Sequence, residues 1–519
     1  MSARLGFFKP AMVWAGFAHA YICIFIGSQI MGGLGAPLGY AAIVGGQIFL
    51  FVYSGLIAHR GSQLGLNFSM MCKATFGKYG YLVPVLLIAG LVSGWFIFQA
   101  WLAADLTVGL YGGKSFNAGT GNGSLPGILG TTSFWAGIFT IAFGMFAVLG
   151  IKAMAWLGKV AVFCVAALEI WMIFTIVTVV AAHTGGNPFE SPVVGKQWSF
   201  ALGFTASVGT FIVSSTMTGD FVRWTRTPKQ AWAVTAVAFP VCNLVTLLIG
   251  GIFTAIAVKL DFFFGLAAVA FGIPMMIMQM SSNGSVCDGC LYNATQGFKN
   301  VIYYISKGKF NLPWRKMAAI IMIIGAGVGV ANLITNIVPW LLLLGTLAPL
   351  VGGVLIGHFW IVARRNTLDE HMKAADKKYN IPALIGLGTG LVIAVIIQIV
   401  SPDLPPVLGG LIGGIGVYPA VAKATGYTLS GKLTTKGLGI DSTLGTSGSS
   451  LGNSYDDKSS SDFSNLQSSN DPENDVNIST NVKSNRFVSK LGKVAEFMLP
   501  GFFQKDIGSG NTSGFRGWP

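Results

Sequence analysis

Acidic residues inside apolar stretches are the strongest chemical candidates in this 519-residue chain. Of its 19 acidic residues, only Glu169 lies squarely inside such a stretch, in the run AALEIWMIF. A charged group in a bilayer core is costly, so it usually has a function. Burial favours the neutral form of a carboxyl group, which would let Glu169 carry a proton. Alternatively, Glu169 is a protonated carboxyl that bonds to a neighbouring helix backbone, and the sequence leaves both interpretations open.

Asp288 is the second acidic candidate, and it follows a polar run near the end of an apolar stretch. If this run is helical, Ser281, Ser285 and Asp288 share one face at i, i+4 and i+7. Oxygen atoms on one face could coordinate a small cation. If Met280 instead ends the apolar stretch, the same residues form an interior loop, and hydropathy alone favours the loop.

Two histidines and one tryptophan complete the candidates inside apolar stretches. His19 and His358 either contact a ligand or, more commonly, hydrogen-bond between packed helices. Trp95 lies among small residues in GLVSGWFIF. Core packing is the usual role of such a side chain, but a planar solute would also stack on it.

Motifs for catalysis or metal binding are not evident in the sequence. Cys287 and Cys290 have C-x-x-C spacing, but a second ligand pair is absent, so we predict no metal site there. No hydrolase or kinase signature occurs, and the loops are too short for a separate catalytic domain. The protein is therefore predicted not to be an enzyme.

The composition shows which elements must position these residues. The chain is 53% hydrophobic and 10% charged, with a mean hydropathy of +0.65, whereas soluble proteins are about a quarter charged. A bilayer core roughly 30 Å thick needs about 20 apolar residues per helix. We predict an all-α polytopic membrane protein with about twelve transmembrane helices. The expected spans are 11–33, 40–58, 81–104, 134–150, 160–182, 198–218, 231–258, 265–292, two within 318–362 broken near 335–339, 381–400 and 407–424.

The distribution of positive charge predicts the orientation of these spans. With the N-terminus inside, the inner segments carry 20 lysine and arginine residues, and the outer segments carry only Lys114, Lys196 and Lys259. This asymmetry follows the positive-inside rule, so both termini are predicted to be cytoplasmic. The formal charge of +14 then reflects topology, and no nucleic-acid partner is expected.

The chain divides into a membrane domain and a tail. Residues 1–426 are predicted to form the transporter domain, with a first repeat at about 10–182, a second at about 198–363 and extra helices at about 381–424. Two successive repeats of five spans each must have opposite topology, as in many secondary transporters. Residues 427–519 are rich in serine and read as a disordered cytoplasmic tail. A short amphipathic helix near 487–499 or an unstructured apolar island are equally good interpretations of its end.

Two sequence runs closely resemble signatures of a known family. They are VGTFIVSSTMTGDFVRWTR at 208–226 and APLVGGVLIGHFWIVARR at 348–365, with weaker matches at 288–298 and 94–96. Both resemble the nucleobase:cation symporter family one, which includes purine and cytosine permeases and hydantoin transporters, and above all its bacterial cytosine permeases. The resemblance covers roughly residues 10–424.

This resemblance implies a five-plus-five inverted-repeat fold of the amino-acid-transporter type plus two further helices. It also places 281–288 inside the membrane and implies an aromatic-lined central site where a base stacks on Trp95. The implied substrate-binding residues are Trp95, His19, Tyr21, Thr210, Phe211, Ser281 and Ser282. The resemblance implies cation coupling at Ser285, which would be a ligand of Na⁺, and the residues themselves add Asp288 and Glu169 as cation-coupling candidates.

The chain departs from the family pattern at the expected site. Val92 replaces a glutamine that binds the base in cytosine permease, Ala20 aligns with an aromatic residue, and Ser282 aligns with an asparagine. This points to the nucleobase class rather than to cytosine. Ser285 and Val286 align with a sodium-ligating threonine pair, so one hydroxyl is lost and proton coupling becomes an alternative.

The prediction is a secondary active symporter in the plasma or inner membrane that works by alternating access. It would import a purine or pyrimidine base, cytosine-like, or a related planar heterocycle, coupled to Na⁺ or H⁺ and without another cofactor. A hydantoin, vitamin or amino acid is the alternative solute. A channel is a weaker alternative because no repeated selectivity-filter run occurs.

Overall fold

The computed structural model describes residues 4, 6–110, 114–115, 119–120, 127–176, 178, 187–194, 196–256, 272–333 and 337–427. The predicted tail, from 428 onward, and its helix near 487–499 lie outside the described residues.

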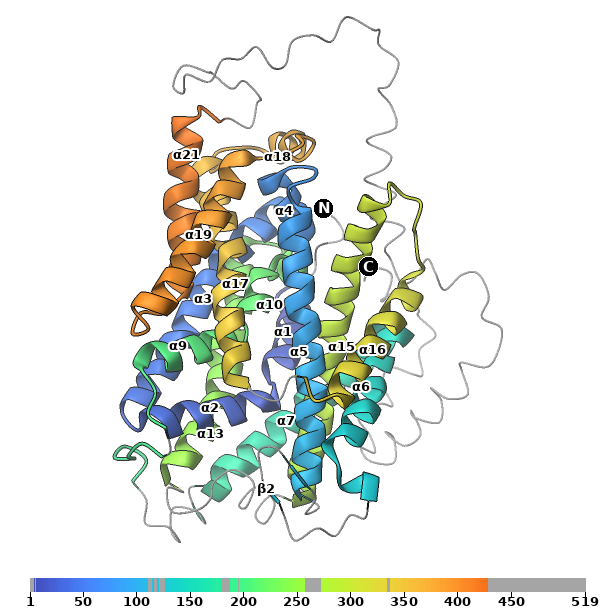
Figure 1. Ribbon diagram of the computed structural model, residues 1–519, viewed down its shortest axis with the longest axis vertical. Coiled ribbons are helices and arrows are strands. Elements are labelled where there is room, and N and C mark those ends of the chain that lie inside the picture. The colour runs from blue at the N-terminus through green and yellow to red at the C-terminus, as the bar shows by residue number, and fades with distance from the viewer. Residues whose placement is uncertain are drawn as a thin grey trace, which may run out of the picture. The chain divides into compact units, whose positions relative to one another are not determined.

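Helices dominate the described part of the chain (Figure 1). The first half contains α1 (Phe8–Ala18), α2 (Tyr21–Leu34), α3 (Leu38–Leu64), α4 (Phe68–Phe76), α5 (Leu82–Leu110), α6 (Thr132–Leu149) and α7 (Ile151–Thr175). Between α5 and α6 lie the short strands β1 (Lys114–Ser115) and β2 (Gly119–Thr120), which pair antiparallel with Lys114 opposite Thr120, and the 3₁₀ turn η1 (Gly127–Gly130).

The second half follows the same pattern of long helices and short connections. It contains α9 (Phe200–Gly209), α10 (Ile212–Thr216), α11 (Gly219–Val222), α12 (Pro228–Ala236), the π-helical η3 (Val237–Asn243), α13 (Leu244–Ile256), α15 (Gly272–Ile305), α16 (Trp314–Val330), α17 (Ile337–Gly357) and the π-helical η5 (His358–Val362). After these come α18 (Leu368–Ala375), α19 (Ile381–Val400), α20 (Val407–Leu411), the π-helical η6 (Ile412–Val417) and α21 (Tyr418–Ala424).

Each of the twelve predicted spans contains a helix or a broken pair of helices. Within the described residues, eight helices are long and apolar enough to cross a membrane, and the bent pair α1 and α2 makes a ninth span. The remaining three predicted spans correspond to the pair α9 and α10, to α15 and to α16.

The eighth span settles the ambiguity that hydropathy leaves between helix and loop. Residues 281–288 lie inside the continuous helix α15, so the loop interpretation is wrong. The helix also runs past the predicted end at Tyr292, to Ile305. It continues because Ala294, Thr295 and Val301 keep one buried face at helical spacing.

Two spans are broken in the middle. α1 and α2 are bent by 54° around His19 and Ala20, and Ala20 adopts an extended conformation. α9 and α10 are separated at Thr210 and Phe211. Neither proline nor glycine occupies the first break, so its cause lies in contacts with other helices rather than in local sequence.

The helices form two packed groups. α5, α6, α15 and α16 lie side by side, and α2, α3, α9 and the α12–α13 span form the other group (Figure 1). Within the second group, α2 and α13 approach closely because each presents a glycine to the other. Gly27 faces the backbone of Leu247, and Gly250 faces the backbone of Ile24.

The segments α20 and η6 pack on α17 in the same way. Gly353 and Gly357 of α17 face the carbonyl oxygens of Gly410 and Gly414. The imidazole of His358 also hydrogen-bonds to the hydroxyl of Tyr418 at 2.8 Å. His358 therefore has the helix-packing role that is more common for such a residue.

We expect Gly250→Ala to weaken the α2–α13 contact, because the added methyl group would overlap the carbonyl oxygen of Ile24. The cost of such overpacking is about 1–3 kcal/mol. The melting temperature of the purified protein should fall.

Gly388→Ala on α19 is the matched control, because its methyl group would meet no heavy atom of the described chain within 4 Å. Equal melting temperatures for the two variants would contradict the packing role of Gly250.

Candidate functional site

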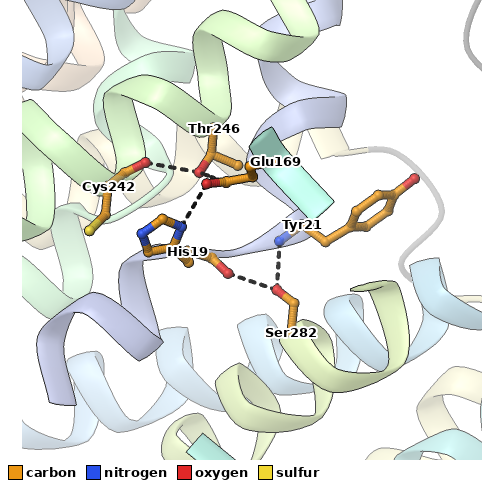
Figure 2. A network of polar contacts seen from close by, with 6 residues as sticks. All are labelled: His19, Tyr21, Glu169, Cys242, Thr246 and Ser282. Atoms are coloured by element: carbon orange, nitrogen blue, oxygen red, sulfur yellow. Dashed lines mark hydrogen bonds and ion pairs between the residues drawn. The ribbon is translucent and has the colours of Figure 1, made fainter. Parts of the chain in front are cut away.

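The break in the first span is held by a residue of the eighth. The Tyr21 backbone N–H donates to Ser282 Oγ at 2.8 Å, and Ser282 Oγ donates to the His19 carbonyl oxygen at 2.8 Å. A helix break in hydrocarbon leaves backbone groups that water cannot satisfy. One hydroxyl of α15 therefore satisfies both sides of the break (Figure 2).

The His19 side chain meets the intramembrane acid. His19 Nδ1 lies 3.0 Å from Glu169 Oε2, at ion-pair distance, although the two groups are not aligned as a straight hydrogen bond. Thr246 Oγ1 donates to Glu169 Oε1 at 2.7 Å or to the Cys242 carbonyl oxygen at 2.9 Å. The Cys242 side chain also contacts the imidazole (Figure 2).

The ion pair faces the protein interior although α7 has a largely exposed surface. Ile170, Trp171 and Phe174 beside Glu169 are exposed, while Glu169 itself is buried. A buried carboxylate needs a charged partner and hydrogen bonds to be tolerated, and His19 and Thr246 supply them. This arrangement makes Glu169 a candidate ion-handling group rather than a group facing lipid.

The break in the sixth span lies in a second polar network. Thr210 Oγ1 donates to the Ser207 carbonyl oxygen at 2.6 Å, and Asn243 Nδ2 donates to Thr210 Oγ1 at 3.1 Å and to Gln47 Oε1 at 2.8 Å. Phe211 is buried at the same break, with its ring centroid 5.8 Å from that of Phe17 in α1. The two broken spans therefore meet through aromatic rings.

The seventh span contacts both breaks. Its Asn243 reaches Thr210 of the sixth span, while Thr246 reaches Glu169 beside the first. These residues lie at and just after the π-helical segment η3, which contains Pro240. The extra residue in a π-turn changes which side chains share a face.

Trp95 is buried in α5, and its ring stacks on Phe98 with centroids 6.1 Å apart and planes at 10°. One turn later, Gln99 is fully buried, and its amide nitrogen and oxygen have no hydrogen-bond partner among the described residues. Asn283 in α15 is also fully buried, and its amide nitrogen and oxygen likewise have no hydrogen-bond partner among the described residues. A buried amide without partners is unusual and requires an explanation such as a ligand or water.

Gln99 and Asn283 lie at the same level of two antiparallel helices. Cys287 Sγ is 3.5 Å from the Phe96 carbonyl oxygen, and Gly297 faces Ala89. Continuing this register by one turn places Asn283 opposite Gln99. Sequence reasoning missed both residues, although each is a polar side chain close to a candidate that it did find.

The remaining predicted residues are placed as follows. Ser281 Oγ donates to the Ile277 carbonyl oxygen of its own helix, and Tyr21 contributes its N–H to the break while its ring points away from the ion pair (Figure 2). Ser285 is buried and faces Gly158 of α7. Asp288 is buried, and its Oδ2 has no hydrogen-bond partner within the described residues.

The structure thus brings His19, Tyr21, Ser282 and Glu169 together at the first break. Thr210 and Phe211 lie together at the second break, and Trp95 lies in the neighbouring α5. The six cysteines of the chain are all free thiols in the structure.

Comparison with known proteins agrees with this geometry. Residues 6–416 match the family described as permease for cytosine/purines, uracil, thiamine, allantoin. The chain belongs to this family of permeases. The structure also resembles Mhp1, a nucleobase-cation-symport-1 family transporter in a closed conformation with bromovinylhydantoin bound, with a TM-score of 0.60, 17% identity, and coverage of 81% of this chain and 94% of that one.

Two curated relatives are similar in sequence to this permease. The cytosine permease of Escherichia coli strain K12 is 25% identical over 425 residues, covering 82% of this chain and 94% of the relative. The allantoin permease of Bacillus subtilis strain 168 is 24% identical over 231 residues, covering 42% and 46%. A Na⁺-coupled sialic acid symporter in an outward-open state shares the fold, with a TM-score of 0.51, 14% identity and coverage of 81% and 90%.

These findings confirm the predicted family and the predicted fold, a polytopic all-α membrane transporter with the Mhp1 architecture. They also confirm that the permease is a multi-pass membrane protein and not an enzyme.

We expect Ser282→Ala to destabilise the first break, because it leaves the Tyr21 N–H and the His19 carbonyl without their shared partner. Each buried group left unpaired costs about 1–3 kcal/mol. The measurement is the melting temperature of the purified permease together with the initial rate of solute uptake.

Thr295→Val is the matched control, since Thr295 is a buried residue of the same helix whose hydroxyl bonds to the Leu291 carbonyl. If Ser282→Ala behaved like this control in both measurements, Ser282 would not hold the break.

Proposed function

We propose that this permease is a secondary active symporter that imports a planar, uncharged heterocycle of nucleobase type together with a cation. The observation that carries the proposal is the buried pair of unpartnered amides, Gln99 and Asn283, one of them a single turn from Trp95. An aromatic plane offers stacking, and carboxamides offer both a donor and an acceptor. A nucleobase has an aromatic face that could stack on Trp95, and its edge carries groups that could hydrogen-bond to the two carboxamides.

The names of the relatives support this class of solute. Cytosine, allantoin and the hydantoin bound to Mhp1 are all small rings with N–H and C=O groups on their edges. Val92 offers no hydrogen bond at the position where the resemblance implies a glutamine, and Gln99 supplies an amide elsewhere on α5. We therefore propose a purine or pyrimidine base, or a hydantoin-like ring, and do not restrict the solute to cytosine.

We further propose that the solute lies between the two packed helix groups. His19, Tyr21, Thr210 and Phe211 would contribute from the broken spans, and Ser281 and Ser282 from α15. Rocking of one helix group against the other would then open the site alternately to each side of the membrane. The breaks would act as hinges because their backbones are not tied into regular helix.

The coupling cation is Na⁺ or H⁺, and the two ions would use different groups. Na⁺ requires several oxygen ligands, for which Ser285, Asp288 and the carbonyl groups of the first break are the candidates. A proton requires a titratable group, for which Glu169 is the candidate.

The proposed orientation places both termini on the cytoplasmic side of the plasma or inner membrane. It rests on the 20 lysine and arginine residues of the inner segments against three in the outer ones. Within the proposed transporter domain of residues 1–426, the repeats are 10–182 and 198–363, and the helices at 381–424 are additional.

Trp95→Ala should abolish saturable uptake while the protein still reaches the membrane, because stacking of a base on an aromatic ring is worth about 1–3 kcal/mol. Uptake of radiolabelled cytosine, uracil, adenine, hypoxanthine and allantoin into vesicles is the measurement. Trp95→Phe keeps an aromatic plane and should retain part of the uptake. Undiminished uptake by Trp95→Ala would remove Trp95 from the site.

Gln99→Leu should weaken the apparent affinity for the transported base by roughly ten- to a hundredfold, because a donor and an acceptor for the ring edge are lost. Gln398→Leu is the control, since it makes the same change on an exposed residue of α19. An unchanged Michaelis constant in Gln99→Leu would show that Gln99 does not contact the solute.

A further inference from the structure

We propose that the coupling cation is a proton and that the His19–Glu169 pair is its binding site. This inference rests on the proposed function, since it assigns the ion that accompanies the solute.

The pair lies at the junction that transport must rearrange. His19 belongs to the break of the first span, and its carbonyl group is bound by Ser282 of α15, in the other packed helix group. Its imidazole contacts Glu169 of α7 at 3.0 Å. A change in the charge of this pair therefore acts on the contact between the first span and two of its neighbours.

The groups that face the pair come from every element packed around it. The second part of the first span contributes the thiol of Cys23, η3 contributes the thiol of Cys242, and α13 contributes the hydroxyl of Thr246. On α15, Ser285 is buried and faces Gly158 of α7, and Asp288 is buried one turn further along. None of these groups is a cation, so Glu169 relies on His19 for its counter-charge.

A single proton decides the net charge of the pair. With the proton bound, the pair is neutral overall, either as imidazolium and carboxylate or as imidazole and carboxylic acid. Without it, a lone carboxylate remains among buried side chains, which is unfavourable. Proton binding therefore favours the packed arrangement in which Glu169 is buried against His19. Proton loss favours an arrangement in which water reaches Glu169.

The exposure of the two side chains indicates how the proton reaches the site. The His19 side chain is 14% exposed and that of Glu169 is 5% exposed. The proton would pass from a hydronium ion to an imidazole nitrogen, so that one O–H bond breaks as one N–H bond forms, and it would leave the pair to water on the other side by the reverse exchange. No other bond is made or broken, and no further reactant is needed.

The seventh span connects the proton site to the proposed solute site. Thr246 bonds to Glu169, and Asn243, less than one turn earlier, bonds to Thr210 at the sixth-span break. A sodium ion at the first break would have to share the carbonyl oxygen of His19 with the hydroxyl of Ser282, which already donates to it.

The test uses proteoliposomes that contain the whole permease, a pH-sensitive dye and no sodium. Exchange of labelled for unlabelled base at equal pH on both sides reports binding and movement of the solute alone. Addition of the same base outside then reports proton entry as internal acidification. The base is the member of the panel of cytosine, uracil, adenine, hypoxanthine and allantoin that exchanges fastest.

We expect exchange and acidification in the natural protein, and exchange without acidification in Glu169→Gln. Glu190→Gln, the same change at an exposed acidic residue, should retain both activities. Glu169→Leu also removes the titratable group, should likewise keep exchange and lose acidification, and is the variant to use if Glu169→Gln does not reach the membrane.

Acidification that persists in Glu169→Gln would overturn the proton site. Base entry into vesicles of the natural protein that requires sodium and causes no acidification would overturn the choice of ion while leaving the proposed function intact. The absence of exchange by the natural protein for every base, with sodium present as well as without it, would overturn the proposed function, and the ion assignment with it.

Discussion

The backbone of a broken helix must find hydrogen-bond partners when water is absent, and this constraint organises the centre of the permease. Ser282 meets it by bonding to both Tyr21 and His19. The bond fixes α15 against the first span, and it leaves the His19 side chain free to meet Glu169. The position of the titratable pair is thus a consequence of how the break is satisfied.

Close helix packing also brings Thr246 into contact with Glu169. Gly27 and Gly250 let α2 and α13 approach until their backbones nearly touch, and Thr246 on α13 then reaches Glu169. The seventh span also carries Asn243 to Thr210. One span therefore contacts both the His19–Glu169 pair and the second break, and such a physical connection can couple binding at two sites.

The sequence predicted the helical spans well because each is a long apolar run whose length the bilayer dictates. It also singled out Glu169, since an acid in such a run is rare. It did not identify His19 as the partner, because the contact joins residues 150 positions apart on different helices. Hydropathy misjudged 281–288 because most of its polar residues, Ser282, Asn283, Ser285 and Asp288, are buried between helices of the same protein. Gln99 escaped notice for a similar reason, since one amide barely changes the average of an apolar window.

Coupling between the solute and the proton is measured most directly by the equilibrium affinity of the purified permease for its base across pH, with and without sodium. Binding linkage requires that a proton taken up with the base tightens base binding. We expect an affinity that rises as pH falls from alkaline to mildly acidic and that does not change with sodium. An affinity that is independent of pH and increases with sodium would contradict it.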